Sequence, residues 1–432
     1  MSRALLIRQG RVVDPACGRD ETADVLIVEG RVAEIGSGLE AGEAEIFDAS
    51  GLVVAPGFID MHVHLREPGF EHAETIESGA RAAAAGGFTA VCCMPNTNPV
   101  NDNATVTRYI VERARQCACV KVYPIGAITK GSAGCELASL GAMKAAGIVA
   151  ISDDGQPVMN SRIMRRAMEN AAALGLPVID HCEDLNLSCS GDMHEGFESV
   201  RLGLRGIPAA SEDIMVARDI LLAAETGAHF HVAHLSTKNA LAMVTYARRH
   251  GVRVTCEVTP HHFVLADSDM APYDSNYKMK PPLRSSGHVE AILEGLTQGQ
   301  VDAIATDHAP HAGSEKMQEF ERCPFGILGL ETAVGLALER LWHSGRLPLV
   351  RLVELFTSAP ARILKLPAGR LSPGAPGDVT LLDLNREWVY DVNRSQSKSR
   401  NSPFHGRRFR GGPSATIVNG TIVWRHDSTE GR

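Results

Sequence analysis

The sequence predicts a mixed α/β fold, a (β/α)₈ TIM barrel with a small β-sandwich domain formed by both chain termini. The first observation is that the middle of the chain alternates eight apolar, strand-like runs with helix-like segments. The second is that roughly 50 residues at the start and roughly 60 at the end consist of short alternating strands separated by turns. Two β-rich ends that flank a long barrel-like middle favour one small domain built from both termini.

The terminal segments have the alternating pattern of β-meanders. The first, residues 1–54, includes "LLIRQGRVVDP" and "ADVLIVEGRVAEIG", and the second, residues 369–432, includes "GDVTLLDLN" and "ATIVNGTIVWR". We expect these two segments to form the sandwich and residues 55–368 to form the barrel.

The eight apolar runs span residues 57–64, 89–96, 121–129, 147–154, 177–184, 229–236, 253–262 and 303–310. The helix-like segments between them include "TIESGARAAAAGG" and "SRIMRRAMENAAALG", which end in glycine as a helix C-cap does. In such barrels the chemistry lies at the carboxyl ends of the strands. The polar residues that end these runs are therefore expected to meet at one rim.

Composition narrows the class of protein. The net charge of −8, from 43 basic and 51 acidic residues, argues against a nucleic-acid binder. No apolar run approaches the roughly 20 residues that span a bilayer, and the start of the chain lacks the features of a signal peptide. Ten cysteines without a Cys-x-x-Cys pair indicate reduced thiols. We expect a cytoplasmic enzyme with no nucleic-acid or membrane partner.

Histidines and carboxylates end several of the runs. His62 and His64 lie two residues apart on a strand, so both side chains point into the barrel mouth. Further candidates end later runs, at Asp153, Asp154, His181, His234, Asp307, His308 and His311. Imidazole and carboxylate groups without thiolate suit zinc, with manganese or cobalt as alternatives. There are enough candidate ligands for two ions, and a carboxylate between them would bridge.

A metal pair at a barrel mouth predicts a reaction class. It lowers the pKa of a bound water and polarises a carbonyl group, while a nearby carboxylate shuttles the proton. Asp307, the terminal acid of the last run, is the natural shuttle. The sequence therefore predicts hydrolysis of an amide-like bond, or the reverse reaction.

The order of the motifs resembles one known family over the whole chain. "GFIDMHVHLREPG", "CCMPNTNPV", "SDDGQPV", "HCED", "VAHLST", "PPLRS", "ATDHAPH" and "SKSRNSPFHG" resemble the class I (bacterial, zinc-dependent) dihydroorotase family of the amidohydrolase superfamily. The resemblance implies reversible cyclisation of N-carbamoyl-L-aspartate to L-dihydroorotate in de novo pyrimidine (UMP) biosynthesis. It also implies two Zn²⁺ ions per subunit, a metal-activated hydroxide, and Asp307 as general acid/base.

Individual roles follow from the same resemblance. The implied metal ligands are His62, His64, Asp154, His181, His234 and Asp307. The implied substrate-binding residues are His64, Arg66, Asn96, Lys280, His311, Phe325 and Gly326. Asp154 corresponds to the bridging carboxylate, although a shift of one residue would select Asp153 instead. Lys280 departs from the family, which usually has Asn before "PPLR"; a lysine offers a point charge rather than an amide.

Several alternatives stay open. A hydantoinase or allantoinase would use a carboxylated lysine, for which Lys121 is a weak candidate. A non-catalytic partner of aspartate transcarbamoylase would have lost metal ligands, and this chain keeps all six. We expect a homodimer and leave association with aspartate transcarbamoylase open.

Three further features have expected structural roles. His261 and His262 are expected to shape the rim, and the basic stretch at residues 393–412 is expected to be a solvated loop. Residues 187–208 form a long loop that suits a lid or an oligomer contact.

Overall fold

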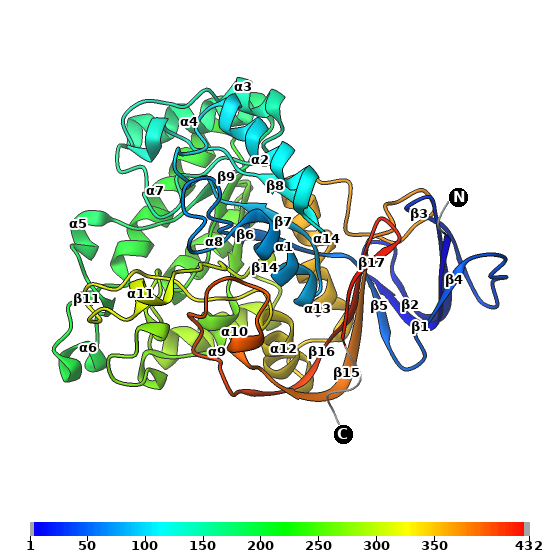
Figure 1. Ribbon diagram of the computed structural model, residues 1–432. Coiled ribbons are helices and arrows are strands. Elements are labelled where there is room, and N and C mark those ends of the chain that lie inside the picture. Colours follow the sequence, from blue (N-terminus) through cyan, green and yellow to red (C-terminus); the bar gives the residue numbers. More distant parts are fainter. Residues whose placement is uncertain (1–3, 427–432) are drawn as a thin grey trace.

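Both ends of the chain share one β-sheet in the computed structural model, which describes residues 4–426 (Figure 1). Its strands are β1 (Ala4–Asp14), β2 (Arg19–Val28), β3 (Arg31–Gly36), β4 (Glu45–Asp48), β5 (Val53–Pro56), β15 (Val379–Val389), β16 (Arg408–Val418) and β17 (Thr421–Arg425). The two terminal segments meet where β5 pairs antiparallel with β15, with Val54 opposite Leu381. Buried side chains from both segments, among them Ile7, Val25 and Ile417, form one apolar cluster. The predicted joining of the termini is confirmed.

The middle of the chain supplies two parallel sheets. One contains β6 (Phe58–Val63), β7 (Phe88–Cys93) and β8 (Lys121–Pro124), and the other contains β9 (Val178–Asp180), β12 (Phe230–Val232), β13 (Val254–Val258) and β14 (Ala303–Ile304). All of these strands fall on or within one residue of the predicted apolar runs. Nearly all of their residues are buried, as expected for strands that are covered on both faces.

Isolated parallel bridges join the two sheets at both seams. Ile151 bridges Gly126 on one side and Val178 on the other, and Val63 bridges His308. The N–H of His64 donates to the carbonyl of His308 at 2.9 Å. The eight predicted runs thus follow one another around the barrel. The run at 147–154 contributes only the Ile151 bridge, because the chain leaves the ladder directly afterwards.

Helices cover the outside of the barrel. They are α1 (Ile76–Ala85), α2 (Ala104–Cys117), α3 (Leu140–Ala146), α4 (Ser161–Leu174), α7 (Ala210–Thr226), α8 (Lys238–Arg249), α10 (Ser286–Thr297), α12 (Ala333–Ala337), α13 (Leu349–Phe356) and α14 (Ser358–Leu364). Local signals set their ends: the hydroxyl of Thr75 accepts from the N–H of Ser78 to cap α1, and Gly175 ends α4 with a left-handed φ of 67°. Within residues 4–426, no helix combines the length and apolar character needed to cross a membrane.

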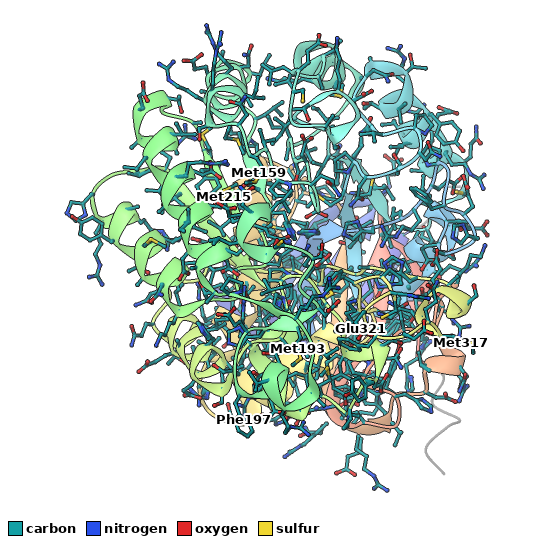
Figure 2. The ribbon with its side chains drawn as sticks, turned by 90° about the vertical axis from the view of Figure 1, so that its left-hand side faces the viewer. Met159, Met193, Phe197, Met215, Met317 and Glu321 are labelled. Carbon is teal, nitrogen blue, oxygen red and sulfur yellow. The ribbon has the colours of Figure 1, made fainter. Side chains whose placement is uncertain are left out.

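Shorter elements lie on the face away from the terminal sheet, which Figure 2 views directly. They include α5 (Leu185–Ser188), β10 (Met193–His194), α6 (Phe197–Leu202), β11 (Gly206–Ile207), α9 (Pro260–Val264) and α11 (Gly313–Lys316). The remaining short helices are the 3₁₀ helices η1 (Lys130–Ser132), η2 (Asp267–Asp269), η3 (Ser275–Tyr277) and η5 (Val392–Arg394) and the π-helix η4 (Leu338–His343). The predicted long loop at 187–208 is therefore folded, with β10 paired to β11, and Phe197 on its α6 is 79% exposed. Its action as a lid or an oligomer contact stays a prediction.

The expectation of a solvated loop at residues 393–412 was wrong. Residues 395–401, here called the return strap, alternate between buried and exposed positions. Ser395, Ser397, Ser399 and Asn401 are buried, whereas the residues between them, Gln396, Lys398 and Arg400, are exposed. The small polar side chains find hydrogen-bond partners on the barrel, so they lie against it although they are not apolar.

Stacked aromatic rings anchor the first barrel strand. Phe58 at the start of β6 stacks on Phe356 at the end of α13, with ring centroids 5.2 Å apart and an interplanar angle of 13°. Phe88 meets both rings edge-on. All three are at most 1% exposed, so the cluster ties β6, which carries His62, to its covering helix.

Phe356→Ala should lower the free energy of unfolding by about 3–5 kcal/mol, because it leaves a cavity under β6 that the packed rings cannot fill. Chemical denaturation followed by circular dichroism measures this change. Leu221→Ala, at a side chain that is 70% exposed, is the control and should change stability by less than about 0.5 kcal/mol. Equal effects of the two substitutions would contradict the assignment of Phe356 to the core.

Candidate metal centre

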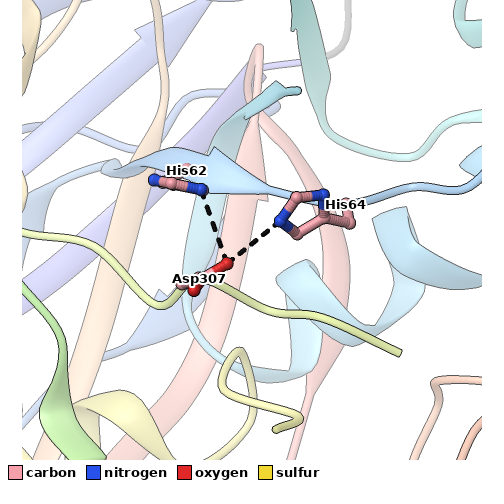
Figure 3. A group of neighbouring side chains, drawn as sticks. All are labelled: His62, His64 and Asp307. Atoms are coloured by element: carbon pink, nitrogen blue, oxygen red, sulfur yellow. Dashed lines mark hydrogen bonds and ion pairs between the residues drawn. The ribbon is translucent and has the colours of Figure 1, made fainter. Parts of the chain in front are cut away.

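Three of the predicted ligands meet at the carboxyl ends of the first and last barrel strands. His64 Nε2 lies 3.0 Å and His62 Nε2 lies 3.4 Å from Asp307 Oδ1 (Figure 3). All three side chains are buried, and their potential ligand atoms lie within 4.8 Å of one another. The period-two spacing on β6 thus brings both imidazoles to one side of the strand, as the sequence predicts.

A second group converges on Asp154. Asp154 Oδ1 lies 3.5 Å from His234 Nε2 and 3.8 Å from His181 Nδ1. The same oxygen is 3.4 Å from His62 Nε2, while Oδ2 is 3.4 Å from His64 Nε2. Asp154 therefore lies between the two groups, and its two oxygens face different sets of imidazoles. This is the arrangement that a bridging carboxylate requires.

Asp153 has a different task. Its Oδ1 accepts hydrogen bonds from the N–H groups of Ile128 and Thr129, at 2.8 and 3.1 Å, and its Oδ2 accepts from the Thr129 hydroxyl. The side chain thus ties the end of the fourth run to the loop after β8. The geometry places Asp154, and not Asp153, among the histidines.

The residues fit a bound cation. His62 Nε2 and Asp154 Oδ1 are buried and have no hydrogen-bond partner within the described part of the chain. A buried polar atom without a partner is costly, and two that face each other beside a second carboxylate are satisfied by a metal ion. Nitrogen and oxygen ligands without thiolate suit zinc among the divalent metals.

Electrostatics support the same conclusion. Burial disfavours charge on His62, yet Asp154 and Asp307 raise the pKa of this imidazole well above its ordinary value. In return, and again against burial, His62 holds the pKa values of both carboxyl groups below their ordinary range. The two aspartates are therefore ionised, and the centre attracts positive charge.

Backbone strain accompanies two of the six predicted ligands. Asp307 has a φ of 46° and His234 a φ of 31°, in the left-handed region that costs a non-glycine residue on the order of 1–3 kcal/mol. Both residues lie shortly beyond the ends of barrel strands, β14 at Ile304 and β12 at Val232. Such strain is concentrated at functional sites, where the surrounding structure enforces it.

Two glutamates that sequence reasoning missed orient the imidazoles. Glu257 Oε1 lies 2.8 Å from His62 Nδ1, so this ring donates from Nδ1 and presents Nε2 to the centre. Glu183 Oε2 lies 3.0 Å from His181 Nε2, which leaves Nδ1 for the centre. A lone acid inside the apolar run "VTCEV" is the sequence signal for Glu257. Glu183 lies in the quoted motif "HCED", but nothing in the pattern singles it out.

Lys280 pairs with one of these glutamates. Its Nζ lies 2.9 Å from Glu183 Oε1 and 5.1 Å from the centroid of the Phe325 ring. The ammonium group, which stands where the resemblance predicts an asparagine, thus neutralises Glu183 beside His181. His181 and Lys280 together hold the pKa of Glu183 down to about 2, although burial opposes the charge.

Three of the predicted substrate-binding residues form a second cluster beside the metal centre. Arg66 Nη2 lies 3.2 Å from His311 Nε2. His311 Nε2 in turn lies 2.8 Å from the carbonyl oxygen of Phe325. Arg66 Nε donates to the carbonyl of Pro310 at 3.1 Å. Burial, then Arg66 and Lys316, lower the pKa of His311 to about 3, so its ring is neutral near pH 7. The cluster therefore combines a guanidinium cation with a neutral imidazole.

Asn96 lies at the metal centre rather than in that cluster. Its Oδ1 is 2.9 Å from His64 Nδ1, and its amide Nδ2 donates to Asp154 Oδ2 at 3.3 Å. In this position the amide orients one imidazole and one carboxylate. It is half-buried, so one side of the group faces the barrel mouth.

Two of the remaining candidates, Lys121 and His262, have partners other than the six predicted ligands. Lys121 lies at the start of β8, away from the carboxyl ends of the strands, and its Nζ pairs with Asp378 Oδ2 at 2.5 Å. His262 Nδ1 lies 2.7 Å from the Thr259 hydroxyl, and its Nε2 lies 2.9 Å from the Pro281 carbonyl. His261 is buried beside His262, and its Nε2 has no hydrogen-bond partner within the described residues. Lys121 is therefore too far from the carboxyl ends of the strands to serve as a carboxylated lysine that bridges two metal ions.

Known proteins are similar to the chain over its full length. A family model described as dihydro-orotase-like matches residues 51–240. A dihydroorotase of Solibacter usitatus is 70% identical over 98% of this chain and 99% of its own, and one of Pelotomaculum thermopropionicum is 55% identical over 97% and 98%.

Solved structures extend the comparison to the fold. The L-hydantoinase (dihydropyrimidinase) of Arthrobacter aurescens superposes with a TM-score of 0.89 at 25% identity and covers 98% of this chain and 96% of that chain. The D-hydantoinase of a Thermus species superposes with a TM-score of 0.83 at 26% identity and covers 98% of this chain and 95% of that chain. The fold is thus shared with cyclic amidohydrolases, whereas identity over the full length is far higher to the dihydroorotases. The chain belongs to the dihydroorotase family.

Proposed function

We propose that the enzyme interconverts N-carbamoyl-L-aspartate and L-dihydroorotate, the cyclisation step of de novo pyrimidine (UMP) biosynthesis. The observation that carries this proposal is the 70% identity to a dihydroorotase over 98% of the chain, combined with a centre where all six predicted ligands converge. A hydantoinase activity is the second candidate, because the solved structures with this fold include hydantoinases.

Two zinc ions per subunit are the proposed cofactor. His62, His64 and Asp307 would hold the first ion and His181 and His234 the second, with Asp154 between them. When bound, zinc polarises a carbonyl group and lowers the pKa of a water ligand. The unpartnered nitrogen of His62 and oxygen of Asp154 support this assignment.

Asp307 is the proposed general acid/base. Its carboxylate is ionised, as a proton acceptor must be, and its Oδ1 lies 3.0 Å from His64 Nε2 at the centre. In the hydrolytic direction it takes a proton from the attacking water and passes it to the ring nitrogen as the amide bond breaks. In the cyclising direction it accepts the proton of the carbamoyl nitrogen as the ring closes and returns it to the departing oxygen.

Arg66, His311 and the loop at Phe325 and Gly326 are proposed to hold the substrate. The guanidinium of Arg66 offers a planar pair of donors to the α-carboxylate. His311 lies beside Arg66 as a neutral ring and fixes the Phe325 carbonyl, and the backbone at Phe325 and Gly326 is proposed to approach the pyrimidine ring. Lys280 adds positive charge at the same rim, which suits a dianionic substrate, and His64 and Asn96 complete the predicted contacts.

Assembly, location and domain limits stay proposals. We propose a cytoplasmic homodimer, and the six retained ligands favour an active enzyme over a non-catalytic companion of aspartate transcarbamoylase. An active enzyme is still able to dock on that partner. We propose domain limits at residues 1–54, 55–368 and 369–432; since β5 of the terminal sheet ends at Pro56 and β6 begins at Phe58, the strands favour a first limit two residues later.

A direct assay separates the two candidate functions. Purified, zinc-loaded enzyme is expected to convert L-dihydroorotate to N-carbamoyl-L-aspartate and to run the reverse reaction, and to leave hydantoin largely unchanged. Loss of absorbance at the wavelength of the dihydroorotate ring measures turnover. Turnover of hydantoin without turnover of dihydroorotate would reject the proposed function.

Asp307→Asn should lower kcat by 10²–10⁴-fold, because the amide cannot accept the proton. Metal analysis of the same preparation shows whether the variant keeps its zinc, so that lost proton transfer is separated from lost metal. Asp302→Asn is a matched control before the same strand, where the carboxylate binds Arg248 instead. Retention of more than about a tenth of the activity by Asp307→Asn would contradict this role.

Asp154→Asn and Asp153→Asn form a matched pair for the bridging ligand. The first should reduce bound zinc, because it removes the carboxylate between the two groups of imidazoles. The second should keep zinc and lower thermal stability, because it weakens the bonds to the loop after β8. Mass spectrometry of the metal content decides which aspartate is the bridging ligand. Loss of zinc in Asp153→Asn, with zinc retained in Asp154→Asn, would show that Asp153 is the bridge instead.

A further inference from the structure

The return strap connects the C-terminal segment to the barrel mouth. The hydroxyl of Ser395 donates to Glu331 Oε1 at 2.6 Å, and the hydroxyl of Ser397 donates to Glu74. The hydroxyl of Ser399 donates to the carbonyl of Ala73 at 2.7 Å. Each inward side chain therefore has a partner on the barrel, and the series ends at Asn401.

Asn401 uses both groups of its side-chain amide on two loops of the rim. Its amide Nδ2 donates to the carbonyls of Ala309 and Gly326, at 2.9 and 3.0 Å, and its Oδ1 accepts from the N–H of His311 at 3.1 Å. Its own carbonyl accepts from the N–H of Leu328 at 2.9 Å. The side chain is only 3% exposed, so water does not replace these bonds.

Those two loops carry the proposed substrate contacts. The first contains His311, and the second contains Phe325 and Gly326. His311 Nε2 lies 2.8 Å from the Phe325 carbonyl, so the loops also touch each other at the site. The fit is tight, because a Cβ on Gly326 would lie 2.5 Å from the Ala309 carbonyl oxygen and 2.7 Å from His311 Cδ2. The distance between the loops is thus fixed by atoms that Asn401 holds.

We propose that Asn401 is a positioning residue that fixes His311 and the Phe325–Gly326 loop relative to Arg66 and so sets the affinity for substrate. This inference rests on the proposed function and deepens it. Asn401 touches none of the six proposed metal ligands in these bonds, so its effect is on substrate binding rather than on metal binding.

Only an asparagine side chain meets this arrangement. Two carbonyl oxygens need two donors and one N–H needs an acceptor, and a single planar amide supplies both. Aspartate keeps the acceptor but places a carboxylate against two carbonyls. Alanine leaves the carbonyl of Ala309 and the N–H of His311 without partners in a buried place, while the carbonyl of Gly326 keeps only Lys316 Nζ at 3.2 Å, so the loops are free to separate.

The test compares steady-state kinetics of zinc-loaded wild type, Asn401→Ala and Asn401→Asp with dihydroorotate as substrate. Both variants should raise KM about 10–100-fold, since a displacement of about 1 Å at a binding group costs up to 10²-fold. Zinc content should stay at the wild-type value and kcat should change much less than KM. Ser399→Ala is the matched control, because it loses a strap bond to Ala73 that lies outside the two loops.

An unchanged KM in a folded Asn401 variant would overturn the inference. An equal rise of KM in Ser399→Ala would also overturn it, because the effect would then reflect general loosening of the strap. Should Asn401→Ala fail to fold, Asn401→Asp, which keeps the size and the acceptor, decides alone by the same criterion. Failure of the proposed function shows differently: the wild type itself would not turn over dihydroorotate.

Discussion

The structure depends on one buried carboxylate, Asp154, which lies among four imidazoles with too few hydrogen-bond donors to satisfy it. Water cannot reach this group freely, and its Oδ1 has no donor within the described residues. A cation at this point compensates the loss of hydration. Barrel closure brings the four imidazoles to the carboxylate from the ends of three strands, β6, β9 and β12, so the stability of the centre and the geometry of the barrel are linked.

Around this carboxylate the protein arranges charge in layers. Glu257 and Glu183 face away from the centre and fix which nitrogen of His62 and His181 points inward. Lys280 then offsets the charge of Glu183 at the rim. The result is a negative centre for metal beside a positive cluster around Arg66 for an anionic substrate. The two subsites differ in sign and are only a few residues apart on the same strand.

The sequence predicts the parts of the site that follow from strand periodicity. His62 and His64 share a face because they lie two residues apart, and the strand ends place Asp307 beside them. The choice between Asp153 and Asp154 needs the structure, because the fourth run leaves the ladder at Ile151 and only coordinates show which carboxylate turns inward. Glu257 and Asn401 act through contacts 195 and 75–92 residues away in sequence, which no local pattern reveals. The sequence predicts a solvated loop for the return strap because its basic residues are conspicuous, whereas the small polar residues between them are the ones that pack against the barrel.

The return strap also has a consequence for how the molecule is made. All six proposed metal ligands lie between residues 62 and 307, so a growing chain possesses them before the return strap emerges from the ribosome. Asn401 and the strands β16 and β17 are synthesised after all of these ligands. A chain cut between Asp307 and Asn401 would keep the proposed ligands and lose the brace of the proposed substrate pocket. The order of synthesis thus separates the residues proposed for metal from the residue proposed to complete the substrate site.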